Sequence, residues 1–262
     1  MSPKEEDPFE NLSPGYEGVG EFYDLFADNA DVPFYIKCAE QFGSPILDLA
    51  AGTGRVTFAL AQKGHEIVAL EQSPSMLSKA KSRLQNFPIQ IANRITLIKG
   101  SMINFNLEKK FRLIIIPTSF AHALTSEDQL SALRCVRRHL QDDGRFILDL
   151  FPAGLQYERA SFEDTPIELD DGRSVTRIGQ IHSDLAKQLM RVDLQYLVRD
   201  SNNQLIDKLD IVSGVALIFN READLLIRLS GFEVDEEFGD FEGNPYTSES
   251  GRRIFILRKK DE

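Results

Sequence analysis

The decapeptide ILDLAAGTGR, residues 46–55, carries the strongest structural signal in the 262-residue chain. Its first half is a short apolar run, typical of a buried strand, and its second half holds Gly52 and Gly54, typical of a tight turn. Glycine tolerates positive φ and lets a ligand lie against bare backbone. A helix that begins near Arg55 would point free N–H groups and the positive end of its dipole at that ligand. The stretch therefore predicts a strand, a ligand-binding turn and a helix.

The same alternation of strand and helix continues to residue 150. Further apolar runs lie at residues 66–70, 95–98, 111–116 and 145–150. They are separated by helical spacing at residues 56–62, 74–84 and 126–140. The runs are continuously apolar, as expected when helices cover both faces of a sheet. This pattern predicts an α/β fold with a doubly wound, Rossmann-like and mostly parallel sheet.

Two other segments have a different texture. Residues 1–15 carry prolines and acids with little periodicity, and we expect them to form a flexible lead. Residues 155–217 contain long stretches in which apolar and polar residues alternate, separated by turn signals, which predicts an antiparallel β insertion with one buried face. Residues 16–154 and 218–262 would then form the Rossmann-like domain.

Composition narrows the classes of function. The chain has 30 Lys and Arg against 41 Asp and Glu, a net charge of −11, which disfavours a nucleic-acid partner. No apolar run is long enough to span a membrane, and the N-terminus does not resemble a signal peptide. The two cysteines fit no metal spacing, and the acids at 235–240 have no fixed geometry, so we predict no metal site. These features indicate a cytoplasmic protein.

Glu71 adds a second half to the ligand site. It ends the second predicted strand, seventeen residues after Gly54. A carboxylate there can accept hydrogen bonds from both hydroxyls of a ribose, so the two parts predict an adenosine-binding crevice at the carboxyl edge of the sheet. A dinucleotide fingerprint would need a third glycine where Thr57 stands, and a phosphate-cradling loop is also absent. A cofactor with an amino acid at its other end fits better.

The stretches DLAAGTGR at 48–55 and VALEQSPSML at 68–77 resemble motifs I and II of class I S-adenosylmethionine-dependent methyltransferases. The resemblance covers residues 45–151, and the C-terminal section is similar to that of members that act on small molecules. It implies a Rossmann-like fold and S-adenosyl-L-methionine as the cofactor. Ser101 departs from the family pattern, because an acidic residue often contacts the adenine amino group at that position.

The resemblance also implies the roles of individual residues. Residues at 48–54 would surround the methionine part of the cofactor, and Glu71 would hold the ribose. Gln72 and Met76 would flank the adenine. Tyr23 would close over the cofactor. The full cofactor-binding set is Tyr23, Asp48, Ala50, Gly52, Gly54, Arg55, Glu71, Gln72, Met76, Ser101, Met102 and Pro117.

His122 is the candidate catalytic residue. It lies six residues beyond Ile116, the end of the fourth predicted strand, in a Ser-x-x-His arrangement similar to that of some amino-sugar N-methyltransferases of this class. An amine or hydroxyl acceptor must lose a proton, and a histidine near its free pKa can accept it. The alternative is a histidine that only packs within its loop. His139 is expected on a solvated helix face.

The predicted function is methyl transfer from S-adenosylmethionine to a small-molecule acceptor, with nitrogen or oxygen as the favoured atom. The insertion would form the acceptor pocket, although it could equally supply a homodimer contact. Two alternatives stay open. One is an NAD-dependent oxidoreductase, which shares the strand, turn and carboxylate. The other is a methyltransferase that acts on a protein or on tRNA.

Overall fold

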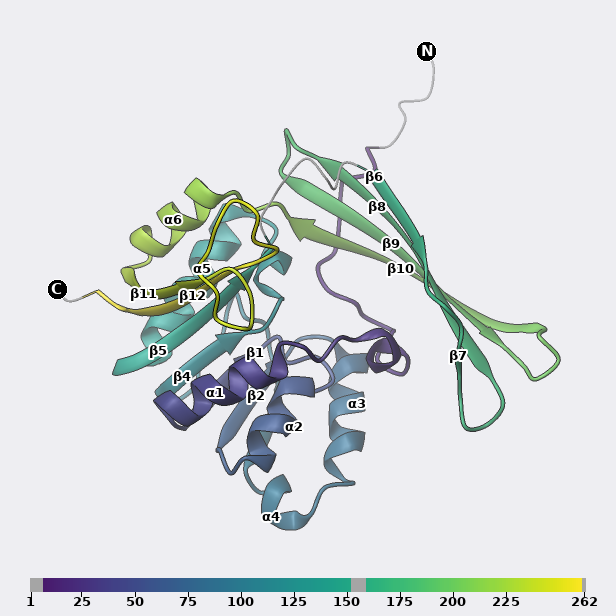
Figure 1. Ribbon diagram of the computed structural model, residues 1–262, viewed down its shortest axis with the longest axis horizontal. Coiled ribbons are helices and arrows are strands. Elements are labelled where there is room, and N and C mark those ends of the chain that lie inside the picture. The colour runs from purple at the N-terminus through teal and green to yellow at the C-terminus, as the bar shows by residue number, and fades with distance from the viewer. Residues whose placement is uncertain (1–6, 152–158, 261–262) are drawn as a thin grey trace.

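Two β-sheets form the computed structural model, which describes residues 7–151 and 159–260 (Figure 1). The larger sheet has seven strands in the order β11-β12-β5-β4-β1-β2-β3. Strands β1 to β5 pair in parallel, and β12 pairs antiparallel with both of its neighbours. The mostly parallel, doubly wound sheet that the sequence predicts is therefore confirmed. Its strands are β1 (Ile46–Leu49), β2 (Ile67–Glu71), β3 (Ile95–Lys99), β4 (Phe111–Ile116), β5 (Leu140–Leu150), β11 (Phe232–Phe238) and β12 (Arg253–Lys259).

Helices cover both faces of this sheet. One face packs against α1 and α2, and the other against α5 and α6. The helices are α1 (Val32–Phe42), α2 (Arg55–Gln62), α3 (Pro74–Leu84), α4 (Ile89–Ala92), α5 (Ser126–His139) and α6 (Asn220–Leu229), with 3-10 turns η1 (Tyr23–Phe26) and η2 (Phe120–His122). In the described part of the chain, none of them has the length and apolar character needed to cross a membrane.

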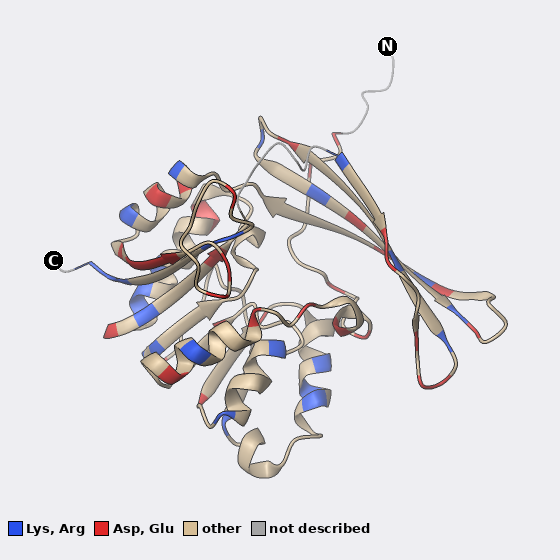
Figure 2. Cartoon of the chain, in the orientation of Figure 1, with Lys and Arg blue, Asp and Glu red and all other residues tan. Residues whose placement is uncertain are grey.

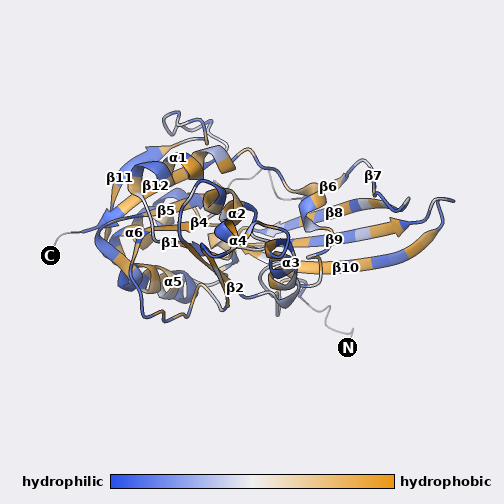
Figure 3. Ribbon diagram, turned by 90° about the horizontal axis from the view of Figure 1, so that it is seen from below, coloured by the Kyte–Doolittle hydropathy of each residue, from blue (hydrophilic) through white to orange (hydrophobic). Residues whose placement is uncertain are grey.

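The second sheet is antiparallel and runs between β5 and α6. Its strands are β6 (Arg159–Glu163), β7 (Ile167–Glu168), β8 (Ser174–Asp184), β9 (Leu189–Arg199) and β10 (Leu205–Ala216). Alternate residues of β9 are buried, as the alternating pattern predicts, and they pack against Val19, Phe22 and Met76. Strand β10 is apolar over residues 211–216, beside the main domain, and more polar further out (Figure 3).

Residues 7–15, part of the expected flexible lead, lie against this second sheet. The carbonyl of Ser13 accepts a hydrogen bond of 2.9 Å from Gly214 N on β10, and Arg191 donates one of 2.9 Å to the Pro8 carbonyl. Lys187 forms an ion pair with Asp7. Strand β10 is at the edge of its sheet, so its free backbone groups give the N-terminal segment a place to bond. Residues 1–6, and the start of the expected insertion at 155–158, lie outside the described residues.

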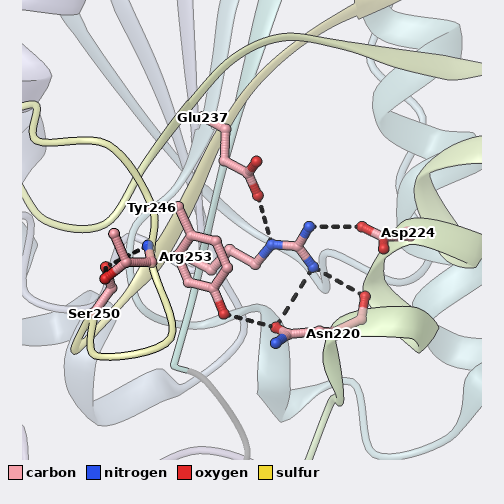
Figure 4. Close-up of polar contacts among 7 residues, drawn as sticks. Asn220, Asp224, Glu237, Tyr246, Ser250 and Arg253 are labelled. Atoms are coloured by element: carbon pink, nitrogen blue, oxygen red, sulfur yellow. Dashed lines mark hydrogen bonds and ion pairs between the residues drawn. The ribbon is translucent and has the colours of Figure 1, made fainter.

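A polar cluster around Arg253 joins the last strands to α6 (Figure 4). The guanidinium of Arg253 lies 2.6 Å from Glu237 Oε1 on β11 and 2.7 Å from Asp224 Oδ1 on α6. It also donates a hydrogen bond to the backbone carbonyl of Asn220. The side chain of Asn220 accepts a hydrogen bond from Tyr246 Oη. The cluster fixes α6 and the loop before β12 against the edge of the main sheet.

A buried hydrogen bond joins the first strand to the first helix of the alternating region. Thr57 Oγ1 on α2 donates to Asp48 Oδ2 on β1 over 2.5 Å, and Asp48 Oδ1 has no protein partner. Burial raises the pKa of Asp48 to about 7, although the bond from Thr57 and the charge of Arg55 oppose this shift. The carboxylate is therefore costly to ionise in the folded chain.

We predict that the free energy of unfolding falls between pH 5 and pH 8 by on the order of 2 kcal/mol through Asp48 alone. The folded pKa lies above the unfolded one, so the folded state holds the proton more tightly and loses that advantage as the pH rises towards 7. Replacing Asp48 by Asn should remove this part of the pH dependence. Urea denaturation of both proteins at several pH values measures it, and the same pH dependence in both would contradict the prediction.

Candidate functional site

A cavity of about 610 Å³ lies where the carboxyl edge of the main sheet meets the inner face of the antiparallel sheet. Its walls come from three parts of the chain: the turns after β1, β2 and β4, the inner residues of β8 to β10, and the N-terminal segment around Tyr16. Junctions of this kind are common places for small ligands.

The turn after β1 presents bare backbone to the cavity. Gly52 has a φ of 59°, and a Cβ added there would meet no atom within 4 Å, so the space in front of it is open. Gly54 serves a different purpose. With a φ of 85° it precedes α2, and a Cβ there would lie 2.5 Å from the Phe58 ring. Gly52 therefore faces a ligand, while Gly54 allows the helix to pack closely.

Glu71 connects this turn to the end of β2. The residue is only 7% exposed, and its two carboxylate oxygens accept hydrogen bonds of 2.7 Å from Gly52 N and Ser73 N. Burial raises its pKa, and the backbone hydrogen bonds oppose that shift. A carboxylate has about four acceptor positions, so about two remain for hydroxyl groups of a ligand in the cavity.

Arg55 lines the cavity as an ion pair with Asp31, a residue that the sequence analysis missed. The pair is bidentate, with Arg55 Nη2 2.7 Å from Asp31 Oδ2 and a second contact between Nη1 and Oδ1. Asp31 directly precedes α1 and is buried. Since these two residues are 24 positions apart and share no motif, no local signal indicated the pair.

A second buried pair lies at the carboxyl end of β5. Arg252 Nη1 lies 3.1 Å from both oxygens of Asp149, which also accepts a hydrogen bond from Thr118 N. Burial raises the pKa of Asp149, and the neighbouring Arg252 lowers it. The sequence did contain a signal for this acid, because residues 147–150 repeat the tetrapeptide ILDL of residues 46–49.

The opposite wall of the cavity is apolar and aromatic. It is formed by inward-facing residues of the antiparallel sheet and by side chains of the N-terminal segment. The alternation in the sequence indicated a buried face here but not that it faces a cavity. Its members are Tyr16, Phe26, Phe162, Ile181, Met190, Val192, Leu194, Tyr196 and Val215.

His122 lies between the two halves of the cavity. Its Nδ1 is 3.2 Å from Gly15 N and 3.2 Å from the Gly214 carbonyl, and its ring meets Tyr16 edge-on. In one tautomer Nδ1 accepts from Gly15, and in the other it donates to Gly214. Both contacts use the same nitrogen, so neither occupies Nε2. Burial lowers the pKa of His122, which keeps the ring neutral at pH 7.

The structure brings most of the predicted site residues to this one cavity. Those that line it are Tyr23, Ala50, Gly52, Arg55, Glu71, Gln72, Met76, Met102 and His122. Those that do not are Asp48, Gly54, Ser101 and Pro117. Asp48 is buried between β1 and α2, and Ser101 bridges to Asn104. After the buried Pro117, the next two residues, Thr118 and Ser119, line the cavity in its place.

His139 is not on a solvated face, and that expectation was wrong. Its side chain is buried, and its Nε2 accepts a hydrogen bond of 2.8 Å from Leu107 N. Its Nδ1 lies 2.7 Å from the Cys135 carbonyl. His139 therefore fixes the loop before β4 to α5, and it does not line the cavity.

Comparison with known proteins gives the same function as the motifs. Residues 46–144 match the model of a methyltransferase domain. The chain is 27% identical over 230 residues to a cypemycin N-terminal methyltransferase from Streptomyces sp, covering 83% of this chain and 84% of that protein. It is 25% identical over 245 residues to dTDP-3-amino-3,4,6-trideoxy-alpha-D-glucopyranose N,N-dimethyltransferase from Streptomyces venezuelae, covering 91% and 92%.

The fold is also shared with solved structures. The CcbJ methyltransferase from Streptomyces caelestis superposes with a TM-score of 0.77 at 20% sequence identity, over 93% of this chain and 96% of that one. Residues 46–144, which match the methyltransferase domain, contain the turn after β1, Glu71 and His122. Residues 46–144 therefore form a methyltransferase domain, and the chain is an S-adenosylmethionine-dependent methyltransferase similar to these enzymes.

Proposed function

We propose that the protein transfers a methyl group from S-adenosylmethionine to an amine nitrogen of a small molecule. The observation that carries the proposal is a single cavity that joins the Gly52–Glu71 crevice, the apolar wall and His122. The two relatives described above are both named for methylation at nitrogen, one at an N-terminus and one at an amino sugar.

The residues of the crevice fit the cofactor. Glu71 has acceptor positions left for the ribose, and the open backbone at Gly52 admits the amino-acid part. Gln72, Met76 and Met102 line the cavity beyond Glu71, where they would flank the adenine. When bound, S-adenosylmethionine supplies a methyl group on a sulfonium, so the leaving group needs no activation by the protein.

The remaining task of the protein is to align the acceptor, exclude water and accept a proton. An amine that binds as its ammonium ion must give up one proton before the nitrogen lone pair can attack the methyl carbon; the methylated nitrogen then carries the positive charge and the sulfur becomes a neutral thioether. We assign that proton to Nε2 of His122, because Nδ1 is engaged by Gly15 or Gly214 and the ring is neutral at pH 7. General base catalysis of this kind contributes about 10²–10⁴-fold.

The proposal has no nucleic-acid partner, and the net charge of −11 supports this. Lys and Arg occur together with Asp and Glu along the strands of both sheets, whereas α3 carries Lys79, Lys81 and Arg83 and no acid (Figure 2). A cytoplasmic location and a homodimer contact through the antiparallel sheet remain predictions from the sequence.

Substituting Glu71 by Ala should weaken the binding of S-adenosylhomocysteine at least about tenfold, since a hydrogen bond to a charged group is worth about 1.5–3 kcal/mol. Titration calorimetry measures the Kd directly, without an acceptor. Glu66→Ala is the matched control. Glu66 precedes the other end of β2, and its side chain is 59% exposed beside Lys109. Equal Kd values for the two variants would contradict the role of Glu71.

Two substitutions of His122 distinguish a role of this residue as a general base from a purely structural role. Asn can reproduce the contact of Nδ1 with Gly15 or Gly214 but offers no group at the position of Nε2. Gln reaches towards the position of Nε2 but cannot act as a base. We expect both variants to lose about 10²–10⁴-fold in kcat, with the KM for S-adenosylmethionine nearly unchanged.

The wild-type kcat/KM should fall at acidic pH with an apparent pKa below 6.5, because the lowered pKa of His122 must be crossed before the base is protonated. Both variants should lose this limb of the pH profile. Full activity in His122→Asn would show instead that the ring only holds the N-terminal segment to β10.

A further inference from the structure

The cations of the cavity indicate which acceptors it can take. Arg177, on β8, extends from the apolar wall and is held on three sides. Its Nε lies 2.6 Å from Asp164 Oδ2. Its guanidinium lies over the ring of Phe26 at 4.8 Å and over the ring of Phe162 at 5.3 Å. Two aromatic rings therefore lie against this guanidinium, and its charge is balanced by a carboxylate.

Arg252 is held in the same way on the other side of the cavity. Its guanidinium pairs with Asp149, as described above, and lies over Phe151 at 3.9 Å and Phe241 at 4.8 Å. Arg177 on β8 and Arg252, directly before β12, thus share one arrangement: each pairs with an aspartate and lies against two aromatic rings. Arginine stacked and paired in this manner is well suited to build a wall.

The remaining charges favour a cation. Arg55, the third arginine that lines the cavity, forms the bidentate pair with Asp31. Apart from these pairs, the charged residues in the lining are acids. They are Asp28, Glu17, which accepts hydrogen bonds from Ser73 and Ser75, and Glu71, which the proposed function assigns to the cofactor. Among the described residues, every arginine in the lining has its own carboxylate, and no lysine lines the cavity.

A phosphate-bearing acceptor meets an unfavourable environment here. Phosphate groups are usually bound by guanidinium or ammonium groups that are free to donate paired hydrogen bonds. In this cavity a diphosphate would compete with a carboxylate at each arginine and would lie near the additional acids. A protonated amine is attracted by the same charges. The apolar wall then suits a ring or chain that carries few polar groups.

We propose that the acceptor is a phosphate-free amine, cationic before it reacts, carried on an apolar ring or chain. This inference rests on the proposed function and narrows it. It separates this chain from the relative that is named for a dTDP-linked amino sugar.

The first test compares two acceptors that present the same amine. One is an amino sugar linked to a nucleoside diphosphate, and the other is the same amino sugar as its phenyl glycoside. We expect kcat/KM to be at least about tenfold higher for the phenyl glycoside, which corresponds to about 1.4 kcal/mol. Equal values, or a preference for the diphosphate, would overturn the inference.

A pair of variants tests the cause. Asp164→Asn removes the carboxylate from Arg177 and should raise kcat/KM for the diphosphate-linked acceptor at least about threefold relative to the phenyl glycoside, since a freed guanidinium can bind phosphate. Asp193→Asn is the control. Asp193 pairs with Arg191 on the same sheet, outside the cavity lining, and its side chain is 30% exposed against 33% for Asp164. An equal change in both variants would overturn the assignment to Arg177.

Binding of S-adenosylhomocysteine, measured first, separates this inference from the proposed function. If calorimetry detects no binding, the proposed function fails and the inference fails with it. If the cofactor product binds but neither acceptor is methylated, the affinities of the two acceptors for that complex decide. Tighter binding of the phenyl glycoside upholds the inference. Equal binding, the reverse order or no binding of either acceptor overturns it, while the proposed function stands.

Discussion

The hydrogen bond from Gly52 N to Glu71 Oε2 is the contact on which the site depends. Strands β1 and β2 run in parallel with Leu49 opposite Leu70, so the turn after one strand and the acid at the end of the other must lie side by side. The bond fixes the carboxylate next to open backbone. Under the proposed function, the nucleoside would be held by two elements that the sheet already aligns.

The antiparallel sheet converts this open crevice into an enclosed cavity. It leaves the main domain after β5 and returns before α6, so its inner face lies over the carboxyl edge where the crevice opens. The N-terminal segment completes the enclosure. It bonds to β10 through Ser13, to the ring of His122 through Gly15, and to Ser73 and Ser75 at the start of α3 through Glu17. One cavity thus draws on both sheets and on the first residues of the chain.

The sequence predicted what local patterns determine. Continuous apolar runs gave the five parallel strands, and the spacing from Gly54 to Glu71 gave the crevice. Contacts between distant segments were not accessible in this way. Asp31 and Arg252 became part of the site only through pairs with residues far along the chain. His139 looked solvated because a helix pattern does not show which loop will pack against it.

Helix α6 shows a related limit. By spacing alone, Leu225, Leu226 and Leu229 of this helix would share one inward face, but Leu225 and Leu229 are 54% and 71% exposed. Ala223 and Ile227 are buried instead. Each residue turns a helix by about 100°, so a shift of one position exchanges the buried face for the exposed one. The short pattern of α6 is compatible with either phase, and only packing against β11 selects one.

The two sheets contribute different parts of the cavity, and this has a consequence for how its selectivity can change. The groups that grip the nucleoside belong to the parallel sheet, whereas Arg177, Asp164 and most of the apolar wall belong to the inserted hairpins. Changes in those hairpins leave the β1–β2 register untouched. Under the proposed function, a substitution at the Arg177–Asp164 pair would therefore change the selectivity for the acceptor and leave the site of the methyl donor intact.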